Sequence, residues 1–197
     1  MNTQEIMNES NTNSGPYWEK ASGSLRILVG LALLAAGAPF VSADDNRAPK
    51  VPDEIVVPEG NRVHFHGYAE GFQIYTWNGS SWGAAVPDAT LFDNEGNVVA
   101  IHFGTPNGPA WKSNSGSEVV GVLPPKAAIV DSNSIPWLRL NADPIRTHGP
   151  GIFANTTFIH RVNTDGGKAP LENGAFLGQV AKVPYTADYF FYRKSNH

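Results

Sequence analysis

The most informative absence in this chain of 197 residues is cysteine, of which it has none. Without thiols the chain has no disulfide framework, no thiolate metal site, no cysteine nucleophile and no cysteine for a lipid anchor. A chain of this length can bury enough surface in one core without such cross-links. The sequence therefore excludes the function classes that depend on a thiol.

Basic charge is also scarce. Lysine and arginine total 14 against 18 aspartates and glutamates, which gives a net charge of −4, and the charges are scattered. A nucleic-acid-binding domain gathers basic side chains on one face, opposite the phosphates. The sequence also lacks a Gly-x-Gly-x-x-Gly turn and a phosphate-binding loop with lysine. We therefore expect no nucleic-acid partner and no nucleotide cofactor.

One apolar run, residues 27–41, follows Lys20 and Arg26 and precedes small residues that end at Ala43. This order of a positive region, an apolar region and small residues is typical of a signal peptide. The run is shorter than the roughly 20 residues that a permanent membrane-spanning helix needs. We predict cleavage after Ala43, so residues 1–43 are a signal peptide. The mature protein is then secreted or periplasmic, without a permanent membrane span.

The segment before residue 27 is longer than the positive region of most signal peptides, which leaves two alternatives. The apolar run could be an uncleaved membrane anchor, or translation could begin at Met7. With cleavage, residues 44–52 form a polar linker and residues 53–194 a single β domain.

The rest of the chain consists of short β-type runs separated by Gly, Pro, Asn and Asp, with a spacing near ten residues and no convincing helix. Hydrophobic residues make up 41% of the chain and charged residues 16%, as in a globular protein. Short, evenly spaced strands predict an all-β fold, either an antiparallel β-sandwich or a flattened barrel.

Side chains alternate between the two faces of a strand. In the first hairpin this places Val63 and Phe65 on one face and His64, His66 and Tyr68 on the other. Whether a residue has an odd or an even position along the strand, its parity, therefore decides which other side chains it contacts.

The last strand carries aromatic residues on both faces, because Tyr189 and Phe191 alternate with Phe190 and Tyr192. An edge strand or a strand with one solvated face would carry polar side chains at every second position. We therefore predict that this strand is central and belongs to the core.

Several short segments, colinear over residues 57–192, together form a recognisable pattern. They are Val57-Pro58-Glu59-Gly60-Asn61, Phe65-His66-Gly67-Tyr68-Ala69-Glu70-Gly71-Phe72-Gln73-Ile74-Tyr75, Pro87-Asp88-Ala89-Thr90-Leu91-Phe92, Ser115-Gly116-Ser117, Val119-Val120-Gly121, Ile135-Pro136-Trp137-Leu138, Gly151-Ile152-Phe153, Arg161-Val162-Asn163-Thr164, Gly166-Gly167-Lys168-Ala169-Pro170 and Val183-Pro184-Tyr185-Thr186-Ala187. In content and order they resemble the domain of unknown function 3455 family, which comprises small exported β proteins of bacteria and fungi.

The resemblance implies a fold and export but no chemistry, because the family has no established catalytic residues to transfer. Many relatives have two cysteines that could bridge the places held here by Trp77 and the region of Asn173 and Gly174. Some fungal members are labelled malate dehydrogenase, an enzyme that needs a nucleotide-binding βαβ unit. This sequence has no such unit, so we do not expect that activity.

His64 and His66 form the pattern with the clearest chemical meaning, because two imidazoles on one strand face lie about 7 Å apart. With a further ligand they would hold copper or zinc, the metals that suit an exported imidazole site. The alternative is that these histidines face solvent or make structural hydrogen bonds. A third ligand could be His102, His148 or His160, and a fourth Glu70 or Asp88.

Aromatic residues suggest an apolar cleft, next to His66 and His102, that would hold a sugar, an aromatic metabolite or a lipid chain. Trp111 lies in the Gly- and Pro-rich residues 104–117, which read as a long loop, and we expect Trp111 and Trp82 to be the most accessible. The alternative is plain core packing. The members of this candidate cleft are Tyr68, Tyr75, Trp77, Trp82 and Trp111.

Arg161 has the opposite parity from Phe158 and His160. It would bind a carboxylate of a ligand, or pair with Asp165, Asp188 or a backbone carbonyl. We add it to the candidate cleft and leave both interpretations open.

These observations favour a non-catalytic exported module that binds a ligand or has a structural role. Its partner would be a small molecule, a glycan or a component of the cell envelope, and no cofactor is expected. The alternative is a copper or zinc metalloprotein, redox-active or hydrolytic, built on His64, His66 and a distant histidine such as His102. No Gly-x-Ser-x-Gly elbow supports a nucleophilic serine.

Overall fold

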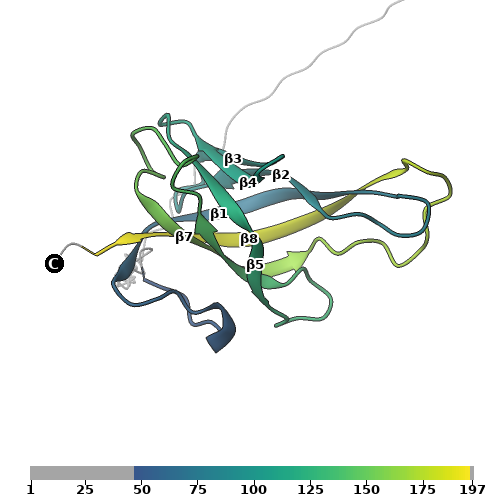
Figure 1. Cartoon of the computed structure of the whole chain (residues 1–197), viewed down its shortest axis with the longest axis horizontal. Helices are drawn as coiled ribbons and strands as arrows, with labels where there is room; N and C mark the ends of the chain where they lie inside the picture. Colours follow the sequence, from purple (N-terminus) through teal and green to yellow (C-terminus); the bar gives the residue numbers. More distant parts are fainter. Residues whose placement is uncertain (1–46, 196–197) are drawn as a thin grey trace, which may run out of the picture. The chain divides into compact units, whose positions relative to one another are not determined.

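A computed structural model describes residues 47–195. These residues form eight antiparallel strands, which close into a barrel (Figure 1). One short 3-10 helix, η1, precedes the strands at Asp53–Ile55. The strands are β1 (Asn61–Thr76), β2 (Val86–Phe92), β3 (Val98–Thr105), β4 (Gly108–Ser113), β5 (Glu118–Ala128), β6 (Trp137–Ala142), β7 (Thr156–Gly166) and β8 (Val180–Lys194).

Each strand pairs with its neighbours in the chain, and β8 pairs with β1 to close the barrel. The prediction of an all-β antiparallel fold is confirmed, and of the two architectures left open the barrel is found. The β1–β8 ladder is the longest, running from Asn61 opposite Lys194 to Thr76 opposite Val180. Since β2 pairs with β1 only as far as Ile74, the two long strands continue together past the end of β2.

Side chains that point into the barrel form the main core. Leu91, Trp111, Ile159, Tyr189 and Phe191 are fully or almost fully buried in it. Burying them removes apolar surface from water, which is the main favourable contribution to folding. The barrel is thus filled by side chains, as is usual for a barrel of this strand number.

The prediction for the last strand is confirmed. Strand β8 pairs with β1 on one side and β7 on the other. Tyr189 and Phe191 belong to the main core, while Phe190 and Tyr192 are buried in a second cluster with Val63. Both faces of β8 are therefore covered, which explains why aromatic residues occupy consecutive positions.

The prediction that Val63 and Phe65 share one face of the strand is wrong, whereas His66 and Tyr68 lie beside each other as predicted. Val63 packs in the second cluster, whereas Phe65 packs against the main core. The cause is an irregularity between these two residues, where Val63 pairs with Tyr192 and Phe65 with Phe191. One extra residue on β1, His64, thus reverses the alternation, as a β-bulge does.

The second cluster lies on the outside of the barrel, beneath the segment that precedes β1. Val51 and Val57 pack against it, and Ile55 in η1 is fully buried. Nε2 of His160 donates to the Ile55 carbonyl over 2.7 Å, and Arg139 donates to the Val56 carbonyl. The segment appears in dark blue at one side of Figure 1, and the end of the expected linker is part of the folded domain.

Residues 104–117 are not the long loop that the sequence predicts. Strand β3 ends at Thr105, a tight turn follows, and β4 begins at Gly108. Trp111 is paired in the centre of this hairpin, opposite His102. The glycines and prolines of the segment therefore mark a hairpin turn rather than an irregular loop.

Two sequence predictions, the apolar run at residues 27–41 and the cleavage after Ala43, lie outside the described residues. Among the residues that are described, no helix is long and apolar enough to cross a bilayer.

Candidate functional site

The candidate site is a cavity of about 230 Å³ inside the barrel, to which all eight strands contribute side chains. The cavity lies at the end where β3 turns into β4, because Thr105 and Gly108 line it. At the other end the barrel is filled by packed rings, with Phe65 and Phe153 both in contact with Phe191. The interior therefore has one solid end and one hollow end.

Most of the cavity wall is apolar, which suits a site for a small organic molecule. Pro87, Pro109, Leu138 and Leu140 provide much of this surface, and Leu123 lies at the exposed edge. Polar side chains stand among them at a few positions. The polar lining residues with long side chains are Gln73, His102, Trp111, Arg161 and Tyr189.

His102 and Trp111 line the cavity side by side, and their rings are stacked with 4.2 Å between the ring centroids. Nδ1 of His102 lies 2.9 Å from the Ala110 carbonyl and donates to it, so the lone pair of the neutral ring is on Nε2. Burial lowers the pKa of His102 to about 3, and the positive charge of Arg161 adds to this effect. His102 is therefore uncharged at neutral pH.

Arg161 is the one charged residue among those that line the cavity. Its Nη2 donates to the Pro136 carbonyl over 2.9 Å, and its guanidinium also lies against the Tyr189 hydroxyl. Within residues 47–195 no carboxylate forms an ion pair with Arg161. Of the partners considered for Arg161, the structure thus shows a backbone carbonyl. No acid of residues 47–195 balances the positive charge of Arg161.

Two buried donors at the cavity have no hydrogen-bond partner: Nε1 of Trp111 and Nε of Arg161. The buried amide of Gln73 lies beside them, in contact with the Tyr185 hydroxyl. Trp111 is 1% exposed, so bulk water does not reach it freely. An unpaired buried donor costs about 1–3 kcal/mol of folding free energy. Two such donors around one cavity indicate a place where an acceptor from outside the chain is bound.

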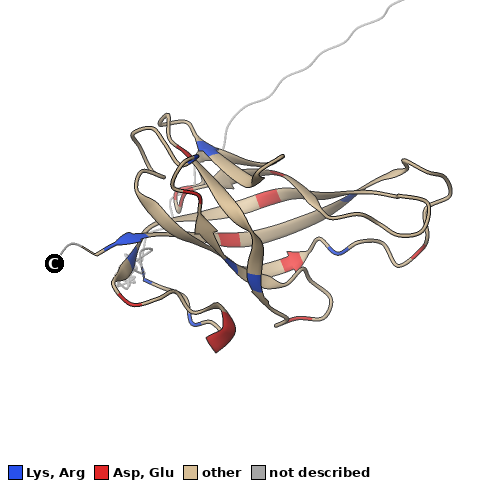
Figure 2. Ribbon diagram, viewed as in Figure 1, with Lys and Arg blue, Asp and Glu red and all other residues tan. Residues whose placement is uncertain are grey.

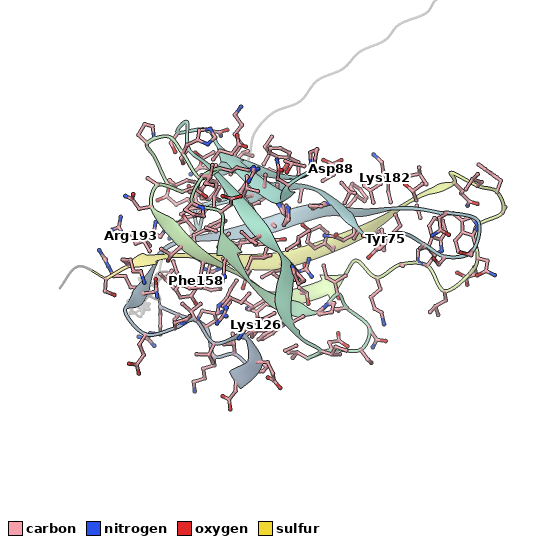
Figure 3. All side chains as sticks on the ribbon, viewed as in Figure 1. Tyr75, Asp88, Lys126, Phe158, Lys182 and Arg193 are labelled. Carbon is pink, nitrogen blue, oxygen red and sulfur yellow. The ribbon has the colours of Figure 1, made fainter. Side chains whose placement is uncertain are left out.

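The candidate cleft is only partly assembled. Trp111 and Arg161 line the cavity with His102, but Trp111 is buried, so its expected accessibility is wrong. The hydroxyl of Tyr75 (labelled in Figure 3) donates to the Gly167 carbonyl over 2.6 Å. It lies where β1 and β8 continue past the end of β2.

The remaining members of the candidate cleft lie elsewhere. Trp77 is buried against Trp82, with ring centroids 5.4 Å apart, beyond the end of β1. The indole nitrogen of Trp82 donates to the Glu172 carbonyl. Tyr68 lies beside His66 and is partly exposed. These side chains therefore do not line the barrel cavity.

The candidate metal ligands are distributed over different parts of the barrel. His66 stacks on Phe190 of the outer cluster, with ring centroids 3.9 Å apart, whereas His102 lies in the interior. Nε2 of His64 lies 3.2 Å from the Thr156 hydroxyl, and burial together with two arginines lowers its pKa to about 4.

The two other histidines proposed as third ligands are engaged in structural contacts. His160 is buried between Ile55 and Tyr192, and Nδ1 of the exposed His148 contacts the Arg146 carbonyl. In the described part of the chain no group of three or more His, Cys, Asp or Glu side chains is placed to hold a metal, with Glu70 and Asp88 included in that search.

Ser115 and Ser117 have a structural role at the filled end of the barrel. Their hydroxyls accept from the backbone amides of Ile152 and Phe153. Both hydroxyls also contact that of Ser113, at 2.9 and 2.8 Å. The Ser-Gly-Ser motif therefore joins the β4–β5 turn to the segment before β7.

Gln73 and Tyr189 are site residues that the sequence reasoning missed. After the bulge, Gln73 has the same parity as the inward-pointing Phe65 and Ala69. A polar residue at an inward position is the signal that would have identified it, since glutamine is rarely buried without a reason. Tyr189 was expected in the core, but its position beside Arg161 follows only from the pairing of β7 with β8.

Figure 2 shows lysines and arginines interspersed with aspartates and glutamates along the ribbon. Within residues 47–195, fold and site together define a small all-β domain, a closed antiparallel barrel with an internal cavity. The chain belongs to the family described as Protein of unknown function (DUF3455), which matches residues 58–193. This confirms the family expected from the sequence. No curated protein and no solved structure gives a significant match.

Proposed function

We propose that this protein is a non-catalytic, exported binding module that holds a small organic molecule in the barrel cavity. The observation that carries the proposal is the pair of unpaired donors, on Trp111 and Arg161, in an otherwise largely apolar cavity. A ligand acceptor in the cavity would satisfy these donors, which the chain itself does not. The apolar wall would contribute affinity by burying the rest of the ligand.

The volume of the cavity favours a small molecule over a glycan or an envelope polymer. At about 230 Å³ it lies below the range of about 300–1,000 Å³ that is common for ligand sites. A glycan chain would need a longer groove. The apolar run at residues 27–41, which we expect to belong to a signal peptide of residues 1–43, supports a role outside the cytoplasm, as a secreted or periplasmic protein.

Binding without catalysis is favoured by the state of the buried histidine. An effective general base has a pKa near the working pH, whereas that of His102 is lowered to about 3 by burial. Its Nδ1 is also committed to the Ala110 carbonyl. His102 therefore serves as a fixed wall of the site.

The proposal is tested by adding small one-ring and short-chain organic molecules to the exported protein and measuring the melting temperature and the heat of binding. We expect at least one compound to raise the melting temperature, because a ligand that binds only the folded state stabilises it. The proposal fails if none of them binds.

A pair of matched variants locates the binding. Leu123→Trp adds bulk at the edge of the cavity, where Leu123 is 57% exposed, and should weaken binding. Leu171→Trp makes the same change at a position that is 94% exposed and outside the cavity, and should leave binding unchanged. Equal affinities of both variants and the unaltered protein would place the ligand elsewhere.

A further inference from the structure

The polar groups of the cavity are biased towards donation. Nε2 of Gln73, Nε1 of Trp111 and Nε of Arg161 all carry hydrogens, and the donors of Trp111 and Arg161 have no partner within the chain. The Gln73 amide contacts the Tyr185 hydroxyl and has a second hydrogen to donate. An amide nitrogen, an indole nitrogen and a guanidinium nitrogen have no acceptor function. The complementary ligand group is therefore an acceptor with several lone pairs.

The positive charge of Arg161 indicates that this acceptor is an anion. Arg161 is a permanently charged group in a largely apolar barrel, and no acid of residues 47–195 forms an ion pair with it. A buried charge is costly until an opposite charge compensates it. A carboxylate matches a guanidinium in shape as well as charge, through short charge-assisted hydrogen bonds.

The number of charges favours a monoanion. The lining contains one arginine and no lysine, and the neighbouring His102 is neutral at physiological pH. A phosphate dianion would bring more negative charge into the barrel than Arg161 balances. The site is therefore better suited to a single carboxylate.

The volume of the cavity and its apolar wall indicate what the rest of the ligand is like. An apolar cavity of about 150 Å³ is sufficient for a benzene ring. The cavity here, about 230 Å³, has room for one ring, or a short branched chain, and a carboxylate. Pro109, Leu138 and Leu140 offer an apolar surface to such a body.

We infer that the ligand is a small monocarboxylate with an apolar body, whose carboxylate is bound by Arg161, Gln73 and Trp111. This inference rests on the proposed function, because it names the class of molecule that the same cavity holds. The carboxylate faces the donors of β1, β4 and β7, and the apolar body lies against Pro109 of β4 and Leu138 and Leu140 of β6.

The test compares acids with neutral molecules of similar shape on the full exported chain. Benzoate and butyrate are titrated against benzyl alcohol and butanol by calorimetry near pH 7. A hydrogen bond to a charged group contributes enough for an affinity difference of about 10- to 100-fold. We expect the two acids to bind tighter than the two alcohols by about that factor.

Two variants identify the anion-binding group. Arg161→Gln should weaken benzoate binding about tenfold or more while leaving the weak binding of benzyl alcohol unchanged. Arg146→Gln removes the same charge from an exposed position outside the cavity and should change neither. Arg161→Lys keeps the charge without the planar fork and should give an intermediate affinity. A melting curve for each variant shows that it is folded.

The outcomes separate the inference from the proposed function. If the alcohols bind as tightly as the acids, the carboxylate inference is overturned and the binding function stands. If no probe binds, both are overturned. If the acids bind and a folded Arg161→Gln protein binds them equally well, Arg161 is not the anion-binding residue. The comparison of acids with alcohols needs no variant, so the inference is testable even if Arg161→Gln does not fold.

Discussion

At the scale of single residues, three histidines make the stability of the protein depend on pH. Burial lowers the pKa values of His64, His102 and His160, to about 4 for His64 and about 3 for His102. In the unfolded chain a histidine titrates near pH 6.5. Between these values the unfolded state binds protons that the folded state does not, so acidification favours unfolding.

The first prediction concerns the pH dependence of stability. We expect the free energy of unfolding to fall as the pH is lowered from 7 to 5, with about 2 kcal/mol of the loss due to His102. His102→Phe removes this titration and should make the decline less steep by about that amount. Urea titrations at several pH values measure the effect, and an unaltered slope in His102→Phe would contradict it.

The second prediction concerns Tyr75, whose buried hydroxyl donates to the Gly167 carbonyl over 2.6 Å. Tyr75→Phe leaves that carbonyl without this donor, and the expected loss is about 1–2 kcal/mol of unfolding free energy. Because Tyr75 does not line the cavity, the affinity for benzoate should not change. A large effect on binding with no loss of stability would argue against this structural role.

At the scale of elements, one inserted residue and one short segment decide how the barrel wall is built. The bulge at His64 turns Val63 outward and Phe65 inward. The apolar side chains on the outer face of the barrel would be exposed to water without the segment that contains Val51, η1 and Val57. This segment packs against them. The wall around β7 and β8 therefore has a buried layer on each side.

The third prediction tests this cover with two neighbouring residues. Ile55 is fully buried, so Ile55→Ala should lower the unfolding free energy by about 2–5 kcal/mol. The side chain of Val56 is 46% exposed, so Val56→Ala should change it by less than about 0.5 kcal/mol. Chemical denaturation gives both values. Equal effects of the two substitutions would mean that the segment does not cover the outer cluster.

At the scale of the domain, closure gives every strand two hydrogen-bonded neighbours. No strand can leave without breaking two ladders, and the first and last strands share the longest one. Closure also removes the two free edge strands that an open sheet of the same strands would have. The barrel should therefore lose its structure as one unit.

The fourth prediction is that unfolding is a single cooperative transition. Tryptophan fluorescence includes Trp111 of the main core and Trp137 beside the outer cluster, while far-ultraviolet circular dichroism reports on all strands. In urea the two signals should change with the same midpoint and the same slope, as in a two-state protein of this size. Separate midpoints would mean that the hollow end of the barrel opens before the rest.

Much of the architecture was accessible from the sequence. The strand-like runs and turn residues indicated an all-β fold, and consecutive aromatic residues at 189–192 indicated a central last strand. The parity of residues 160 and 161 is confirmed, since His160 lies in the outer layer and Arg161 lines the cavity. These features depend on neighbours along the chain, where the alternation of side chains holds.

The sequence by itself determined the fold class, the family and the presence of Trp111, His102 and Arg161 as residues worth attention. Only the tertiary structure decided that these three meet inside a barrel with Gln73, and that His66 does not join them. The physical reason is register: one extra residue at His64 exchanges the faces of a strand. The closure that forms the cavity depends on the pairing of β1 with β8, strands at opposite ends of the domain.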